Sequence, residues 1–436
     1  MKVFKGRKAP GYLLSMVVAA TLVAPAQAYN LYAEDGAELN LDVEAIFGAF
    51  SSEKSYLLDT DSGADWQEAY IKAGFSGSNT YGKQGAAVYG AVNVLASGSF
   101  GDGDAAGFTT GDEDRTAIED AYVGWRSGNL IPALGENGLD ISFGRQNVTI
   151  GDGFLINGDS LNLGEFAGSL SDRGGAYWLA ARKAFDKTFW AKVGGDSGLR
   201  SDLFWFESDN EAQSNVEMAG INVEYVGDKG TFGAMYLEGL DQNDRLANGH
   251  DRDGQETVSL RYQGNAGVEN LFLSAEIVSQ ESGSGVDTEA WYAEAGWTFA
   301  NMPWSPSVNY RFTSYDDGFD SLFFGFNRGY GTWFQGEVAA NYAGPFGSSA
   351  DIHHVGIKAS PSDTLTVGAL WFDFNNSTTF GSNSDGQELD IYAEWVVNDH
   401  LIISPLIGFY SPDSGNATQR SSGDNTYVQV LAIVPF

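Results

Sequence analysis

The chain contains no cysteine, so it has neither a disulfide framework nor a thiolate metal site. It is also poor in basic residues: 24 Lys and Arg stand against 58 Asp and Glu, which gives a formal net charge of −34. Nucleic acid is therefore excluded as an expected partner, because its binding relies on an excess of positive charge.

Histidine is scarce, and this weighs against catalysis. The four histidines are His250, His353, His354 and His400, and none lies in a pattern that pairs it with a nucleophile. No Gly-x-Ser-x-Gly element is present at a strand-to-helix turn. We expect no enzyme activity and no cofactor.

Long apolar runs are missing as well. The clearest one, Tyr12–Ala24, is shorter than the roughly 20 residues that a membrane helix needs. It follows a basic segment and precedes Ala26-Gln27-Ala28, a small-residue cleavage pattern. Residues 1–28 are predicted to be a secretory signal peptide, and residues 29–436 a single domain.

What the mature chain has in abundance is glycine and aromatic residues in alternating segments. In the full sequence Gly occurs 56 times, Phe 28 times and Tyr 20 times. Leu39, Leu41 and Val43 alternate with polar residues, and the same period of two recurs from Ala69–Phe75 through Tyr177–Ala181 to Leu401–Phe409. This pattern predicts an all-β fold: a closed antiparallel transmembrane β-barrel with one apolar and one wet face on each strand.

The last segment, Asn425–Phe436, shows how the barrel would close. Val428, Val430 and Val434 share one face with the terminal Phe436. We expect this strand to pair with the first one, near Glu38–Ser51, because an unpaired edge is not tolerated in lipid. An aromatic C-terminus is typical of outer-membrane barrels, so Phe436 is predicted to engage the barrel-assembly machinery.

Connection lengths alternate and predict the orientation of the strands. Short turns such as residues 227–229 alternate with long polar loops such as residues 98–114, as expected for short periplasmic turns and long extracellular loops. The pattern gives about 18 strands, within a range of roughly 16–20. Gly175–Gly194 fits one long strand or a hairpin, and Phe319–Gly331 an infolded loop or a short strand. A soluble β-sandwich or propeller is the alternative fold.

Charged strand residues fall opposite the apolar face, where they would line a wet interior, because a charge facing lipid is costly. The predicted pore-lining residues of this kind are Lys72, Arg126, Arg182, Lys192, Arg200, Arg261, Arg311, Lys358, Glu44, Glu388, Asp390 and Glu394. Basic residues gather between Ala121 and Phe312, whereas the first strand and Gly386–Val396 offer only acids. This distribution predicts either a transverse field between a basic and an acidic wall, or simple mutual neutralisation.

Arg145 breaks this parity, since it shares the register of Ile141 and Phe143. Either its strand has reached the membrane interface, or a bulge at Gly144–Gln146 turns the side chain inward. The glycine-rich loop that follows, Asn147–Gly174, is a candidate for folding into the barrel and narrowing it.

Acidic residues crowd one long loop, where Asp102, Asp104, Asp112 and Asp114 are weak candidates for binding Ca²⁺. The spacing of an EF-hand loop is incomplete, so solvated loop carboxylates are the alternative. An intermediate hypothesis is that divalent cations bridge these carboxylates to lipopolysaccharide phosphates. Outer-membrane lipid and lipopolysaccharide are the expected surroundings.

Three passages resemble the alginate-export family of outer-membrane barrels. They are Gly144-Arg145-Gln146 followed by Gly151-Asp152-Gly153, then Tyr29–Gly36, and then Arg328–Glu337. The resemblance implies an 18-stranded channel in the outer membrane of a Gram-negative bacterium. It also implies that Arg145 and Asp152 lie at the constriction and that Arg328 lines an infolded segment.

Two functional hypotheses follow. The first is a passive porin-like channel for saccharides, uronate oligomers or other small hydrophilic solutes, and the strongly acidic composition suits a broad porin as well as a polyuronate exporter. The second is a structural or adhesive barrel that does not conduct.

Overall fold

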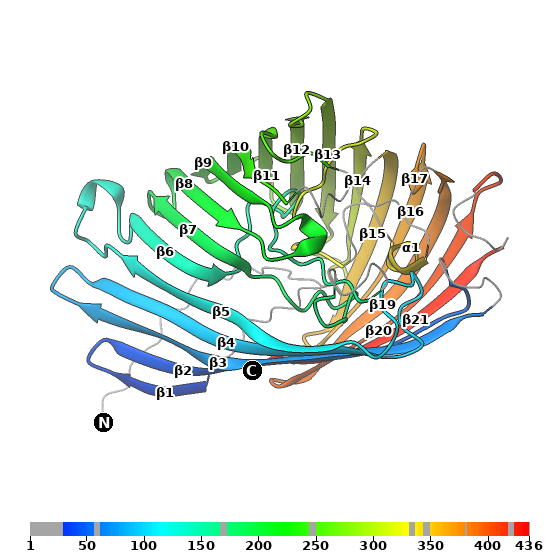
Figure 1. Ribbon diagram of the computed structural model, residues 1–436, viewed down its shortest axis with the longest axis horizontal. Coiled ribbons are helices and arrows are strands. Elements are labelled where there is room, and N and C mark those ends of the chain that lie inside the picture. Colours follow the sequence, from blue (N-terminus) through cyan, green and yellow to red (C-terminus); the bar gives the residue numbers. More distant parts are fainter. Residues whose placement is uncertain are drawn as a thin grey trace.

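The computed structural model describes residues 29–55, 62–165, 172–243, 250–330, 336–342, 349–379, 382–416 and 423–435. The predicted signal peptide and Phe436 lie outside these residues. Within them, 19 strands form a single antiparallel sheet, and β17 and β18 form a separate two-stranded sheet (Figure 1). The large sheet comprises β1 (Tyr29–Glu34), β2 (Ala37–Ser52), β3 (Ala64–Tyr81), β4 (Ala86–Gly101), β5 (Asp114–Arg126), β6 (Leu139–Gln146), β7 (Phe185–Val193), β8 (Gly198–Glu207), β9 (Glu217–Gly227), β10 (Gly230–Asp241), β11 (Glu256–Gly264), β12 (Leu271–Glu281), β13 (Asp287–Thr298), β14 (Ser307–Tyr315), β15 (Ala350–Ser362), β16 (Leu365–Asn375), β19 (Gly386–Asn398), β20 (Leu401–Pro412) and β21 (Asn425–Pro435).

The sheet closes where the first long strand meets the last one. β2 pairs with β3 along its whole length, and on its other side Glu44–Ser52 pair with residues 427–435 of β21. The short β1 pairs with residues 37–41 of β2. It lies on the same edge of β2 as β21 and in line with it, so it does not add a further position around the barrel. Eighteen strands therefore go around the barrel, as the sequence predicted, with β1 as an added hairpin.

Alternation along the strands separates the two faces of the wall. Phe47, Ile71 and Phe75 are each about half exposed on the outside of the barrel. Inward neighbours such as Trp66 and Glu68 are fully buried. The outer face thus presents apolar side chains to lipid while polar groups gather inside, which is the arrangement that a barrel in a membrane requires.

Short turns lie at one end of the barrel and most of the long connections at the other, which is the extracellular end in outer-membrane barrels. Two long connections enter the lumen. We call the described residues of 147–184, between β6 and β7, the first infolded loop, and the described residues of 316–349, between β14 and β15, the second infolded loop. The second one carries the helix α1 (Glu337–Tyr342) (Figure 1).

The strand predicted at Tyr177–Ala181 is wrong, because residues 175–184 belong to the first infolded loop and the strand begins at Phe185. Leu179 and Ala181 are buried against the inner wall, which produces an alternation like that of a strand. Phe319 to Tyr330 form part of the second infolded loop, and their one strand-like feature among the described residues is a bridge from Phe323 to Ile156. No helix in the described ranges has the length and apolar character needed to cross a bilayer.

Candidate functional site

The two infolded loops meet inside the barrel through main-chain hydrogen bonds. The amide of Phe323 donates to the carbonyl of Leu155 (2.9 Å), and the amide of Asn157 donates to the carbonyl of Phe323 (2.7 Å). Gly325 donates in the same way to Gly153 (2.8 Å). Gly153 has a φ of +82°, and a Cβ there would lie 2.1 Å from the Gly325 carbonyl oxygen. A side chain at this position would push the loops apart.

An ion-pair network fixes this junction to the wall. Nε of Arg328 lies 2.5 Å from Oδ2 of Asp152, and its Nη2 lies 2.9 Å from Oε2 of Glu294. Asp152 also accepts hydrogen bonds from Ser274 (2.7 Å) and Tyr292 (3.0 Å). Asp152 and Arg328, which the resemblance placed near the constriction, are thus in direct contact although they lie on different loops.

The balance of charges in this network explains how it can be buried. Burial alone would lower the pKa of Arg328, but the carboxylates of Glu294 and Asp152 outweigh it and raise that pKa above its usual value. The guanidinium also stacks near Phe272, 4.9 Å from the ring centre. Arg328 is therefore a permanent cation that holds both carboxylates in place.

Beside the network lies a cavity of about 800 Å³ that reaches toward the short-turn end. Its cationic lining comes from four of the predicted pore residues, and its acidic lining comes from six carboxylates. These are Arg126, Lys192, Arg200 and Arg261, with Glu136, Asp140, Asp152, Asp196, Asp202 and Glu224. The aromatic rings of Trp190, Tyr262 and Tyr292 complete the lining. Aromatic surface with convergent polar groups is typical of sites that bind small polar molecules.

Most of the cations around this cavity are paired with neighbouring acids. Arg126 lies 3.0 Å from Asp140, and Arg200 and Arg261 lie 2.5 and 2.6 Å from the two oxygens of Glu224. Elsewhere in the lumen Lys72 lies 3.3 Å from Glu44. In these pairs the acidic and basic side chains of the lumen neutralise each other, which was the alternative to a transverse field. The expected free acidic wall is absent at Glu44, because that carboxylate is held by Lys72.

Glu388 and Asp390 do not line the cavity, which corrects the second half of the expected acidic wall. Both are buried beneath α1, where Glu388 accepts hydrogen bonds from the amides of Val338 and Ala339 (2.7 Å each). The first amides of a helix have no partner within it, so a carboxylate satisfies them. On the same side Glu394 is buried, and Lys358 is half-buried on β15.

Arg145, Arg182 and Arg311 also lie away from the cavity. Arg145 sits at a bulge in the pairing of β6 with β7, as one alternative predicted, but it pairs with Asp186 and Asp209 (2.9 and 2.7 Å) instead of joining Asp152. Arg182 is buried and donates to the carbonyls of Arg173 and Arg115 (2.9 and 3.2 Å). Arg311 is buried against the ring of Phe326 (4.8 Å).

Three of the four calcium candidates, Asp102, Asp104 and Asp112, accept hydrogen bonds from their own loop or from β3. Asp104 is fully buried and accepts hydrogen bonds from the amides of Ala106 and Thr109. Asp112 accepts from the Thr110 hydroxyl (2.7 Å), and Asp102 accepts from the Asp65 amide (3.1 Å). In the described part of the chain, no three acidic or histidine side chains come together in a metal-binding arrangement. The local hydrogen bonds engage carboxylate oxygens of Asp102, Asp104 and Asp112 that a cation would need.

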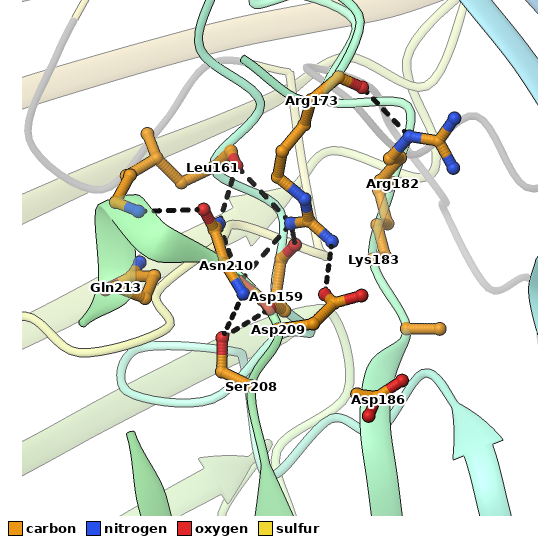
Figure 2. Close-up of polar contacts among 12 residues, drawn as sticks. Asp159, Leu161, Arg173, Arg182, Lys183, Asp186, Ser208, Asp209, Asn210 and Gln213 are labelled. Atoms are coloured by element: carbon orange, nitrogen blue, oxygen red, sulfur yellow. Dashed lines mark hydrogen bonds and ion pairs between the residues drawn. The ribbon is translucent and has the colours of Figure 1, made fainter. Parts of the chain in front are cut away.

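Sequence reasoning missed the anchor of the first infolded loop, which Figure 2 shows. Arg173 donates to the Asp159 carbonyl (2.7 Å) and lies 3.2 Å from Asp209 in the β8–β9 connection. Asp159 in turn accepts from Ser208 (2.7 Å) and Asn210 (2.9 Å) of that connection. These residues lie in loops, where no periodicity points to them; the closely spaced polar residues of 208–210 were the only available signal.

A comparison with family models identifies the family of this chain. Residues 50–331 match the model described as alginate export. The chain belongs to the alginate export family. With its closed barrel, this member of the alginate export family is an outer-membrane channel protein. No match is found among curated proteins.

Solved structures show the same fold at low sequence identity. The outer membrane protein OpdK from Pseudomonas aeruginosa superposes with a TM-score of 0.57 at 10% identity, covering 91% of this chain and 98% of its own. OccK2 (OpdF) of P. aeruginosa and OccAB2 of Acinetobacter baumannii each give 0.54, at 13% and 11% identity, with 90% of this chain and 98% of theirs covered. At such identities the comparison concerns the fold alone.

Proposed function

We propose that this alginate export family member is a passive channel for saccharides, uronate oligomers or other small hydrophilic solutes. The observation that carries the proposal is the cavity of about 800 Å³, whose wall combines charged pairs with aromatic rings. A solute in this cavity would contact Arg126, Lys192, Arg200, Arg261 and Asp152. Hydroxyl and carboxylate groups suit these partners, and the rings suit the apolar faces of sugars.

The charge of the lining favours a neutral or mixed solute over a long polyanion. Six carboxylates and four cations line the cavity, and the three arginines are already paired with acids. A polyuronate chain would have to compete with those acids for each arginine. We therefore place neutral sugars and short uronates ahead of a long polyanion.

Solute flux tests this proposal. Proteoliposomes containing the purified protein should swell in isotonic neutral sugars, more slowly in acidic sugars of equal size, and not at all without protein. Arg200→Ala together with Arg261→Ala should alter the ratio of acidic to neutral flux, whereas Lys229→Ala, an exposed charge in the β9–β10 turn, should leave it unchanged. Equal exclusion of every sugar by the folded protein would contradict the proposal.

A barrel that does not conduct is the second candidate, and one observation favours it. Apolar side chains of both infolded loops, including Phe154 and Phe323, pack against Tyr292 and Phe206 of the wall and fill part of the lumen. Planar-bilayer recording separates the two candidates, because a filled barrel gives no conductance steps.

A further inference from the structure

The barrel wall is incomplete beside β5. This strand runs from Asp114 to Arg126, but it pairs with β6 only from Ala121 onward, because β6 ends at Gln146 where the first infolded loop turns inward. The loop covers the gap from inside: the amides of Lys183 and Ala184 donate to Glu119 of β5 (2.6 and 2.8 Å). The gap lies toward the long-loop end of the wall.

A pocket of about 400 Å³ occupies this gap. Four arginines line it, Arg115 from β5, Arg145 from β6, and Arg173 and Arg182 from the loop behind. Ile118 borders the same pocket and is half exposed on the lipid-facing surface. The pocket therefore connects buried arginines of the loop with the outside of the barrel.

The pocket brings four arginines together in a strongly acidic protein, whose formal net charge is −34. Its two lining acids are already engaged: Asp186 by Arg145 (2.9 Å), and Asp209 by both Arg145 (2.7 Å) and Arg173 (3.2 Å). Arg173 also lies 3.5 Å from Asp159 and Arg182 lies 3.7 Å from Glu119, whereas Arg115 takes part in no ion pair among the described residues.

Hydrogen-bond donors also remain unused there. Arg182 is only 2% exposed, and its Nη1 has no hydrogen-bond acceptor within the described residues; Oε2 of Glu119 lies 3.7 Å away. Nε of Arg145 is also buried and has no hydrogen-bond acceptor within the described residues. Arg115 is exposed and makes one long bond, 3.4 Å, to the Asp172 carbonyl. Unsatisfied buried guanidinium groups are costly, so a missing acceptor is expected.

We propose that this pocket binds a phosphate group of an outer-leaflet lipid, namely lipopolysaccharide. Arg115 is the second residue of β5 and Arg145 the penultimate residue of β6, so both lie where strands meet the long loops. In an outer-membrane barrel this is the level of the outer-leaflet headgroups. Phosphate oxygens match the fork of arginine donors, and the lipid's acyl chains would lie along the apolar wall at Ile118.

Native mass spectrometry of the detergent-solubilised protein tests this, with lipid A as the probe and lipid A stripped of its phosphates as the comparison. We expect the phosphorylated form to bind and the stripped form to bind about tenfold more weakly. Arg115→Glu should weaken binding of phosphorylated lipid A by a similar factor. Lys229→Ala, which also removes an exposed cation but at the opposite end of the barrel, should not.

Ile118→Glu is a second variant that removes no arginine and places a carboxylate at the mouth of the pocket. It should weaken binding in the same way, and the heat-dependent gel mobility of each variant establishes that the barrel is folded. Equal binding of both lipid A forms, or equal loss in Arg115→Glu and Lys229→Ala, would overturn the proposal. Competition by inorganic phosphate with no retention of lipid A would overturn the lipid as its source.

Discussion

Arg328 is the side chain that joins the second infolded loop to both the first one and the wall. It bridges Asp152 and Glu294 in a place where water is largely excluded. Replacing it by Ala leaves the buried Asp152 without its cation and leaves Glu294 with Arg311, 3.8 Å away. Removing one partner of a buried ion pair costs about 3 kcal/mol or more.

We therefore expect Arg328→Ala to lower the free energy of unfolding by about 3 kcal/mol and to raise open-channel current noise, because the loops lose their tether. Urea titration of gel mobility and bilayer recording measure the two effects. Arg328→Lys keeps the charge and should recover part of the stability. Unchanged stability in Arg328→Ala would show that the network holds nothing in place.

A second buried pair predicts how the protein responds to acid. Asp320 of the second infolded loop accepts from Nε and Nη2 of Arg252 (2.6 and 2.8 Å). Burial raises the pKa of Asp320, but Arg252 outweighs it and lowers that pKa from 3.8 to about 2. A lowered folded-state pKa means that this stabilisation is complete above the unfolded value and is lost as the pH falls from 3.8 toward 2.

We expect acidification from pH 3.8 toward pH 2 to lower the free energy of unfolding of the wild type by about 2 kcal/mol. Asp320→Asn should not show this loss. Asp320→Asn should be less stable than the wild type at pH 7, with the difference shrinking toward pH 2. Unfolding titrations at several pH values provide the measurement. Parallel curves for the two proteins would refute the role of this pair.

At this scale, strand parity predicted which side chains face inward. Lys192, Arg200 and Arg261 all line the cavity, and each lies opposite an apolar neighbour in sequence. Parity could not reveal that Asp152 contacts Arg328, because neither lies on a strand and 176 positions separate them. Nor could it show that Arg311 is covered by Phe326, because Phe326 belongs to the second infolded loop inside the barrel and not to a neighbouring strand.

At the scale of elements, the junction of the infolded loops depends on Gly153. Gly153→Ala combines a strained positive φ with a clash against the Gly325 carbonyl, which we expect to cost about 1–3 kcal/mol. The loops should separate locally and alter the conductance. Gly195→Ala, where a Cβ meets nothing closer than 3.5 Å, serves as the matched control. Identical conductance in both variants would mean that the junction does not shape the pore.

Closure of the sheet was predictable from sequence, whereas the loops were predictable only in part. β2 and β21 each alternate over their length, so their pairing followed from the need to leave no edge. The strand predicted at Tyr177–Ala181 failed because a loop packed against a barrel's inner wall also buries apolar residues such as Leu179 and Ala181. The seating of Glu388 under α1 could not be foreseen, since a helix of six residues gives no periodic signal.

At the scale of the whole molecule, charge is distributed unevenly around the barrel. The overall net charge is strongly negative and the cavity lining has a small excess of carboxylates, yet four arginines gather at the pocket in the wall beside β5. An acidic lining raises the local concentration of cations. The alginate export family member is thus expected to conduct cations better than anions.

The reversal potential of single channels in a planar bilayer under a KCl gradient directly tests whether this barrel is an open channel that prefers cations. We expect discrete conductance steps with a reversal potential displaced toward that of K⁺, and a smaller displacement in Asp202→Asn. A correctly folded protein that gives no steps, or one that prefers Cl⁻, would contradict it.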